Sequence, residues 1–337
     1  MHPMTARGSG AAPTIVDVAR AASVSKTTAS DALRGQGRVS EQTREIVVRV
    51  ARELGYTPNR SARSLRTAVA EAIGLHIPEF LTRSDYYRTF VFGVIEQAAV
   101  RNYNVTLISS GHLPQQGPVP HVDGLVLCDP VAEDPVVRDL AQTSVPIVTA
   151  ERFVGAPRPM GVVESDHERL TIELFDHLRD QGAGRVALLA SGTTSDWSVT
   201  VQRTYRDWAR RRKLPVVLRA APFGSSPEVI RGVVEQLLRE DPEIDALVCA
   251  ADGAAAAVLP TINAAGRAVG KDFLLASGVD SPAMQLADPP ITAIALDPQR
   301  MGAECAELLC EIIAGDAAPD AVREMPIELR LRASTRA

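Results

Sequence analysis

The chain has 337 residues, which is too long for one ordinary hydrophobic core, so the sequence predicts two or three domains. Hydrophobic residues make up 45% and charged residues 23%, as in a typical soluble globular protein. No apolar stretch approaches the roughly 18 residues of a membrane-spanning helix. The first residues also lack the apolar segment of a signal peptide, so we expect a cytoplasmic protein with no membrane partner.

The charge is distributed unevenly along the chain. Residues 1–70 contain eleven Lys and Arg and five acids, which gives +6, so the other 267 residues must carry −11 to reach the total of −5. A small basic segment joined to an acidic body predicts contact with nucleic acid at one end only.

Patterns typical of enzymes and metal proteins are absent from the sequence. No G-x-G-x-x-G follows a predicted strand and no G-x-S-x-G is present. The histidines lack metal-ligand spacing, and we expect surface or capping roles for them, including His167 and His177. The sequence therefore predicts no catalytic residue, no metal and no cofactor. The four cysteines are expected to be buried thiols: Cys128, Cys249, Cys305 and Cys310.

Three short helices are predicted after a disordered tail of residues 1–12. Thr14 and Asp17 fit a capping pattern for a helix over Ile15–Ala22. Ser25 can cap a second helix over Lys26–Leu33, and Ser40 a third that ends at Gly55. A tight turn between the first two helices predicts a helix-turn-helix, although a three-helix cap on a larger enzyme has the same outline.

The second of these helices separates the two interpretations. It offers little apolar surface for packing, and its outer face is polar, so contact with a DNA groove would explain its composition. The polar face consists of Lys26, Thr27, Thr28, Ser30 and Asp31.

The segment after Pro58 is basic, and it is too short to be helical alone in water. Asn59 can cap a helix there, and Leu65 would be exposed between Arg63 and Arg66. One interpretation is a flexible linker. The other is a helix that folds on DNA and inserts its leucine between base steps.

From residue 70 onward, apolar strands alternate with helices, which predicts parallel doubly wound sheets. The pattern occurs twice, so we expect two lobes with a ligand between them at the carboxyl ends of the strands. The predicted strands are Ala72–Ile77, Val105–Ser109, Val122–Leu127, Pro146–Thr149, Arg185–Ala190, Ala246–Ala250 and Phe273–Ser277. The predicted helices are Phe90–Arg101, Glu168–Arg179, Thr204–Lys213, Ser226–Arg239 and Ala254–Gly266.

The run from Thr14 to Arg66 resembles the headpiece of the lactose/galactose repressor (LacI/GalR) family of bacterial transcriptional regulators. The matching pieces, in order, are T-I-x-D-V-A, V-S-x-x-T, R-V-S-x-x-T-R, L-G-Y-x-P-N and A-R-S-L. The resemblance implies that the second helix enters the major groove and that the following segment becomes a minor-groove hinge helix with Leu65 as its wedge. The residues that it implies for DNA contact are Lys26, Thr27, Thr28, Ser30, Asp31, Asn59, Arg60, Arg63, Leu65 and Arg66.

Asp31 departs from the family pattern, because many members carry Arg or His at this position. A carboxylate cannot bridge guanine O6 and N7, but it can accept a hydrogen bond from cytosine N4. We therefore expect an altered half-site preference at that base.

Residues 73–333 resemble the same family's effector domain, which is similar to periplasmic sugar-binding proteins. The matching pieces include I-G-L-x-I-P, V-D-G-L-V-L and V-P-I-V. By this resemblance the cleft holds a sugar or nucleobase-like effector, bound by Tyr86, Asp166, Arg203, Asp252 and Asp280. The stretch from Ser109 to Val122 is shorter than in relatives, which usually place a full helix there.

The sequence thus predicts an all-α helix-turn-helix headpiece joined to an α/β effector domain of two doubly wound lobes. We expect a DNA-binding domain at 13–58 and a hinge at 59–69. The N-terminal lobe is expected at 70–163 and 294–325, and the C-terminal lobe at 164–293 and 326–337. The expected function is a nucleoid-associated repressor that binds a palindromic operator as a homodimer under allosteric control by the effector. The alternatives are a sugar sensor and a sugar- or nucleotide-processing α/β enzyme with a DNA-binding head.

Overall fold

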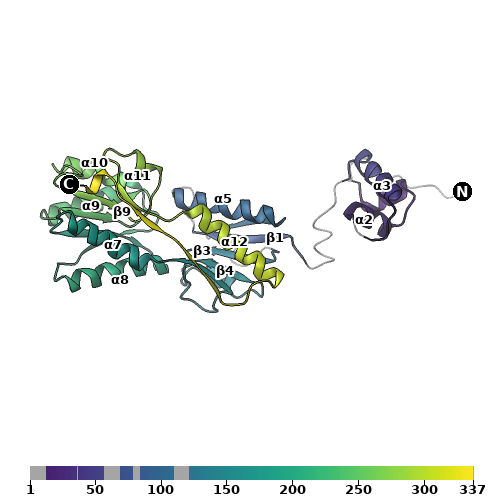
Figure 1. Ribbon diagram of the computed structural model, residues 1–337, viewed down its shortest axis with the longest axis horizontal. Coiled ribbons are helices and arrows are strands. Elements are labelled where there is room, and N and C mark those ends of the chain that lie inside the picture. Colours follow the sequence, from purple (N-terminus) through teal and green to yellow (C-terminus); the bar gives the residue numbers. More distant parts are fainter. Residues whose placement is uncertain (1–12, 36, 57–68, 79–83, 110–120, 337) are drawn as a thin grey trace. The chain divides into compact units, whose positions relative to one another are not determined.

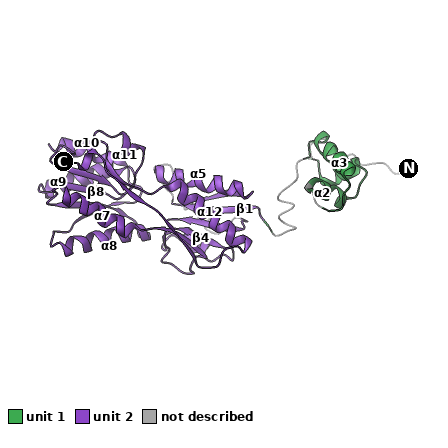
Figure 2. Ribbon diagram, viewed as in Figure 1, with its two compact units in different colours: residues 1–69 green, residues 70–337 purple. Residues whose placement is uncertain are grey.

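The computed structural model describes residues 13–35, 37–56, 69–78, 84–109 and 121–336. It divides into two compact units, residues 1–69 and 70–337 (Figure 2). The predicted tail and nearly all of the predicted hinge lie outside the described residues. In the part that is described, no helix is long and apolar enough to cross a membrane.

The first unit contains the three predicted helices, α1 (Ile15–Ala21), α2 (Lys26–Arg34) and α3 (Glu41–Glu53). Polar side chains begin them: the Ser25 and Ser40 hydroxyls accept from helix amides at 3.0 and 3.3 Å, which satisfies donors that have no partner within the helix. Gly35 ends α2 with φ +68°, a conformation that glycine adopts without strain.

The core of this unit is small. Val18, Val47 and Val50 pack with four alanines, and α2 contributes the buried Ala29 and Ala32 and the partly buried Leu33. The second helix therefore buries little side-chain area, as the sequence predicts. Its polar side chains lie outside this core.

The second unit contains two sheets, each six-stranded. The sheet of the N-terminal lobe has the order β11-β5-β4-β3-β1-β2, and every pair is parallel. Its strands are β1 (Ala72–Ile77), β2 (Asn104–Ser109), β3 (Gly124–Cys128), β4 (Ile147–Ala150), β5 (Gly161–Ser165) and β11 (Ala321–Met325). Strand β11 comes from the C-terminal part of the chain, so the lobe is built from two separate segments.

The sheet of the C-terminal lobe has the order β12-β10-β9-β8-β6-β7, with β12 antiparallel to β10. Its strands are β6 (Val186–Gly192), β7 (Val217–Pro222), β8 (Ala246–Cys249), β9 (Leu274–Ser277), β10 (Thr292–Ala295) and β12 (Glu328–Arg330). The chain passes between the lobes after β5, after β10 and after β11. The predicted two-lobed, mostly parallel α/β fold is therefore confirmed.

Helices cover both sheets (Figure 1). They are α5 (Asp85–Val100), α6 (Pro135–Ala141), α7 (His167–Asp180), α8 (Asp196–Arg211), α9 (Pro227–Glu240), α10 (Ala254–Ala264), α11 (Pro282–Leu286) and α12 (Pro298–Ala314), with a 3-10 turn at Ala333–Thr335. The four cysteines are free and buried, as predicted.

Helices α5 and α12 lie side by side in the N-terminal lobe (Figure 1). Their backbones approach closely at two glycines. A Cβ on Gly93 would lie 1.9 Å from the carbonyl oxygen of Gln299, and one on Gly302 would lie 2.2 Å from that of Phe90. Only glycine fits at this crossing.

The structure differs from the sequence prediction at several elements. Helix α8 begins at Asp196 and not at Thr204, and α5 begins at Asp85 and not at Phe90. Strand β7 was not predicted, because residues such as Arg219 are exposed along it and no continuous apolar run marks it. Strands β5, β10, β11 and β12 and helices α6, α11 and α12 were also not predicted. Of these, β5 and α12 contact elements far away in the chain.

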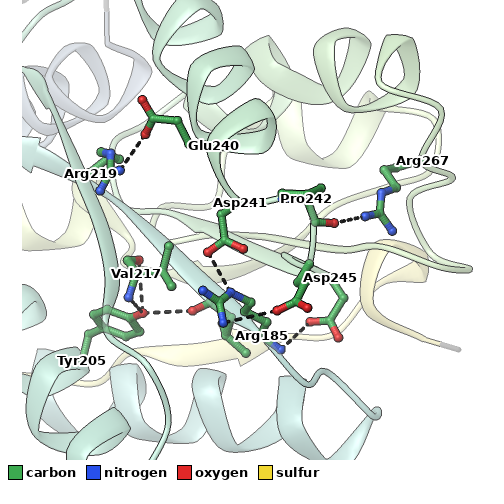
Figure 3. A network of polar contacts seen from close by, with 11 residues as sticks. Arg185, Tyr205, Val217, Arg219, Glu240, Asp241, Pro242, Asp245 and Arg267 are labelled. Carbon is green, nitrogen blue, oxygen red and sulfur yellow. Dashed lines mark hydrogen bonds and ion pairs between the residues drawn. The ribbon is translucent and has the colours of Figure 1, made fainter.

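A polar network joins the amino ends of β6, β7 and β8, at the end of the sheet away from the strands' carboxyl termini (Figure 3). The Asp245 carboxylate accepts from the Gly184 and Arg185 amides at 2.6 and 2.8 Å, and Arg185 Nε donates to Asp241 at 2.7 Å. The Tyr205 hydroxyl lies 2.9 Å from the Val186 carbonyl and accepts from the Val217 amide at 2.9 Å. It thus ties α8 to two neighbouring strands.

Replacement of Tyr205 by Phe is expected to lower the free energy of unfolding by about 1–3 kcal/mol, because buried backbone groups of β6 and β7 lose their partner. Chemical denaturation of the full chain measures this. Tyr103→Phe is the control, because its hydroxyl makes no hydrogen bond with a described residue. Equal stability of the two variants would show that the Tyr205 hydroxyl contributes nothing.

Candidate functional site

The polar face of α2 is one candidate site. Lys26 and Thr27, at the start of the helix, are exposed, and their backbone amides lie at its positive end. A helix start that presents a cation and a hydroxyl is suited to contact with phosphates and base edges in a DNA groove.

The other predicted DNA-contacting residues of α2 are half-buried. The Thr28 hydroxyl lies 2.8 Å from that of Ser25, within the helix cap. The Asp31 carboxylate lies against Gly37 in the loop after the helix, 3.0 Å from where a Cβ of Gly37 would be. Ser30 is half-buried beside it. Of the predicted DNA-contacting residues on α2, Lys26 and Thr27 are therefore the most accessible to DNA. The remaining predicted DNA-contacting residues lie outside the described residues: Asn59, Arg60, Arg63, Leu65 and Arg66.

The second candidate site is a cavity in the two-lobed unit, with an empty volume of about 1240 Å³ that includes space open to solvent. Its wall is formed by the start of α5 and the ends of β3 and β4 on one side. The ends of β6, β7, β8 and β9, with parts of α7 and α8, form the other. This is the location that parallel doubly wound sheets favour for ligands. Among the described lining residues the aromatic side chains are Tyr86, Tyr87, Phe175, Trp197 and Phe223.

Two of the five residues predicted for the effector meet at this cavity. Both Tyr86 and Asp252 line it, and the Asp252 carboxylate accepts from the Ser84 hydroxyl at 3.0 Å and from the Tyr86 amide at 3.2 Å. Because Ser84 and Tyr86 belong to the N-terminal lobe and Asp252 to the C-terminal lobe, these bonds connect the two lobes across the cavity.

The other three predicted effector residues do not line the cavity, which corrects the sequence analysis. Asp166 caps α7, where its carboxylate accepts from the Arg169 amide at 2.9 Å. Arg203 is 61% exposed and pairs with Glu168 at 3.3 Å on the outer surface of α8. Asp280 forms a two-pronged ion pair with Arg332, at 2.7 and 2.8 Å. Arg203 points outward because the inner face of α8 is occupied by side chains such as Trp197 and Val201.

Three titratable side chains of the cavity wall were not predicted from the sequence as ligand-binding residues. Asp129 follows β3 and Glu151 follows β4, and each is buried. His167 begins α7, and its Nε2 lies 3.0 Å from Glu151 Oε1. The Tyr87 hydroxyl donates to Asp129 at 2.8 Å, and the Ser165 amide donates to Glu151 at 3.2 Å. The surface or capping role predicted for His167 is therefore wrong, since its side chain is 11% exposed and lies in the cavity.

The environment of this cluster shifts its protonation. Burial raises the pKa of Asp129 to about 7, and the neighbouring Glu151 carboxylate adds to the rise, while the hydrogen bond from Tyr87 opposes it. Burial lowers the pKa of His167, but the neighbouring carboxylates, Glu151 first and then Asp129 and Asp196, together outweigh it, so the net shift is upward. Within the described residues no group of His, Cys, Asp and Glu is arranged to hold a metal ion.

A simple signal marks the missed residues. Asp129 and Glu151 are the first polar residues after two apolar strands, and parallel strands end at the same edge of a sheet. Both have a positive φ, +45° and +66°, which turns the chain sharply at the cavity rim.

These two sites define a class of protein: a regulator with a helix-turn-helix DNA-binding unit and a separate ligand-binding unit. Comparison with known proteins supports both halves. Residues 14–59 match the model of bacterial regulatory proteins of the lacI family, and residues 175–335 match the periplasmic binding protein-like domain. The chain thus carries a lacI-family DNA-binding domain and a periplasmic binding protein-like domain, which together are the domain set of a DNA-binding transcriptional regulator.

Relatives extend along nearly the whole chain. The HTH-type transcriptional regulator CelR of Thermobifida fusca is 29% identical over 319 residues, which is 90% of this chain and 93% of CelR. Catabolite control protein A of Priestia megaterium is 26% identical over 337 residues, 96% of this chain and 99% of that protein.

Solved structures share the fold. A CelR–cellobiose complex superposes with a TM-score of 0.70 at 27% identity, over 96% of this chain and 99% of that one. A Lac repressor dimer bound to operator and the anti-inducer ONPF superposes with a TM-score of 0.83 at 24% identity, with the same coverage.

Asp129→Asn is expected to change how stability depends on pH. A carboxyl whose folded pKa is raised stabilises the fold at low pH and loses that contribution as pH rises through about 7. From pH 5 to pH 8 the parent should therefore lose about 2–3 kcal/mol relative to the variant, at about 1.4 kcal/mol per pKa unit. Denaturation curves at both pH values measure this, with the exposed Asp316→Asn as control. Parallel pH profiles of parent and variant would contradict the assignment.

Proposed function

We propose that the protein is a repressor that binds a palindromic operator as a homodimer, and that a small molecule in the cavity controls its affinity for the operator. The observation that carries the proposal is the combination, in one chain, of the exposed start of α2 with a cavity whose wall comes from two lobes. Acting on chromosomal DNA, it would reside in the cytoplasm with the nucleoid.

The cavity wall is suited to a sugar or nucleobase-like ring. Aromatic faces stack on such rings, and carboxylates accept hydrogen bonds from their hydroxyl or amino groups. The relative CelR has been crystallised with cellobiose, which supports a sugar or sugar derivative as the ligand class. We propose that the cavity binds this molecule without transforming it, because the named relatives are transcriptional regulators.

A ligand can control the operator only if it binds one arrangement of the lobes more tightly than the other. Bonds across the cavity provide such an arrangement. Asp252 accepts from Ser84 and Tyr86, and the Thr194 hydroxyl of the C-terminal lobe donates to Glu133 of the N-terminal lobe at 2.8 Å. A ligand that alters these contacts changes lobe closure, with a coupling free energy of typically about 1–3 kcal/mol.

Selection from random duplex DNA tests the DNA-binding half. At roughly physiological salt, where non-specific affinity is weak, the purified chain should enrich a palindrome. Thr27→Ala should then weaken the selected operator by about 1–3 kcal/mol with unchanged headpiece stability, if Thr27 contacts a base edge. Thr28→Ala is the matched control, because its hydroxyl belongs to the Ser25 cap and its loss should lower headpiece stability. Failure to enrich any sequence, with and without candidate sugars and purines, would contradict the proposal.

The outer face of α5 supports a homodimer, since a two-fold protein matches a palindromic site. Phe92, Ile95 and Val100 are 60%, 43% and 71% exposed on this helix, which leaves an apolar surface in the N-terminal lobe.

Phe92→Glu is expected to convert the dimer to monomers, because it places a charge in this apolar surface. Sedimentation velocity measures the mass, and operator affinity should fall with it. Val229→Glu is the control, because Val229 is an exposed apolar residue (46%) on a different helix, α9. A Phe92→Glu variant that stays dimeric would exclude this face as the interface.

A further inference from the structure

The cavity wall contains more acidic than basic side chains. Among its described residues, the ionisable groups other than the tyrosines are Asp129, Glu151, Asp252 and His167, and neither Lys nor Arg is present. Arg203, the cation that the sequence predicted for the cleft, lies on the outer surface. Anionic molecules such as sugar phosphates would meet three carboxylates and one histidine that is already paired with Glu151, so the wall disfavours them.

Within this wall, Glu151 forms a direct ion pair with His167, whereas Asp129 forms none with a described residue, and the charge of His167 offsets only part of the rise in the pKa of Asp129. The two carboxylates follow neighbouring strands, since Cys128 and Ala150 are register partners. Glu151 pairs with His167 at 3.0 Å. Of the described residues, only Tyr87 donates a hydrogen bond to the Asp129 side chain, and it is neutral. Asp129 is 7% exposed, so its charge is poorly compensated by solvent.

A second observation points to a ligand. Ser191, at the end of β6 in the opposite lobe, lines the cavity and is 2% exposed, yet its hydroxyl has no hydrogen-bond partner among the described residues. A buried hydroxyl without a partner is rare in folded proteins. A bound molecule with a polar group would satisfy it.

Aromatic side chains complete the surroundings of Asp129. The Tyr87 ring packs edge-on against Tyr86 and Phe223, with ring centroids 5.4 and 6.2 Å apart. Tyrosine and phenylalanine rings attract cations at their faces, so they favour a positively charged group that a sugar ring alone does not supply.

We propose that the effector carries a protonated amino group that pairs with Asp129, and that its ring packs against the aromatic wall, as in an amino sugar. The inference rests on the proposed function, because it specifies the ligand class of the same cavity. An ammonium group gives the buried carboxylate a direct ion pair, which none of the described residues provides, and can donate three hydrogen bonds. A hydroxyl group on the same ring provides no charge, and an acetylated amine has lost it.

Matched probes test this on the full-length dimer by calorimetry. The series is cellobiose, the corresponding glucosamine disaccharide and its N,N′-diacetyl form, together with glucose, glucosamine and glucose 6-phosphate. At a pH where the amine is protonated, each amine should bind roughly tenfold more tightly than its hydroxyl and acetylated partners. Glucose 6-phosphate should not bind. Equal or tighter binding of the neutral sugars, binding of the phosphate, or no preference for any amine would overturn the inference.

The Asp129→Asn variant tests the residue. It keeps the shape of the side chain and an acceptor for Tyr87, so it should lose the preference for amines while its affinity for neutral probes changes little. Asp166→Asn is the control, because this carboxylate lies outside the cavity, and it should keep the preference. An Asp129→Asn protein that still prefers amines would overturn the assignment of this residue. If the variant does not fold, the binding of the probe series to the parent protein decides the ligand class.

The proposed function is tested separately by operator affinity. If a neutral sugar binds and changes operator affinity, the repressor proposal stands and the amine inference fails. If an amine binds with the expected preference but operator affinity does not change, the ligand class stands and the allosteric proposal fails.

Discussion

The close approach of α5 and α12 is the contact on which the two-lobed unit depends. Gly93 and Gly302 allow the two backbones to touch, and no larger residue fits at either position. Helix α12 enters the N-terminal lobe only after the chain has passed through strands β6 to β10 of the C-terminal lobe, so this contact joins segments that are far apart in sequence. It also fixes α5, whose first turn carries Tyr86 and Tyr87 into the cavity. The position of this part of the cavity wall therefore depends on a helix–helix contact whose glycines do not line the cavity.

The two ends of the C-terminal sheet have different tasks. At the amino ends of its strands, Tyr205, Arg185 and Asp245 satisfy backbone groups and hold neighbouring strands together. At the carboxyl ends, the chain turns into the cavity, and the Ser191 hydroxyl there has no hydrogen-bond partner among the described residues. One end of the sheet is thus held by hydrogen bonds, whereas the other presents polar groups that a ligand can bind. This arrangement suits a site that is held in place and responds to a ligand.

Local signals predicted the headpiece well, whereas the cavity depends on contacts that no local signal reports. Ser25, Ser40 and Gly35 begin or end helices through groups within a few residues, so sequence reasoning found α2 and α3 almost to the residue. The positions of Arg203 and Asp280 were inferred from a resemblance, and each forms an ion pair away from the cavity. The direction of a helix face depends on tertiary packing, which explains why Arg203 was misplaced. The rule that parallel strands end together would have found Asp129 and Glu151.

The charge of the cavity and the contacts between the lobes lead to one mechanism. Asp129 and Glu151 belong to the N-terminal lobe, whereas Ser191 belongs to the C-terminal lobe. A molecule that pairs with Asp129 and also satisfies the Ser191 hydroxyl must touch both lobes, so part of its binding free energy is available only when they are closed. That difference in affinity is what shifts a conformational equilibrium, and a ligand held by one lobe alone would shift nothing. Asp129, which forms no ion pair with a described residue, and the Ser191 hydroxyl, which has no hydrogen-bond partner among them, lie on opposite walls, and a ligand that contacts both supplies the free-energy difference that an effector of this regulator requires.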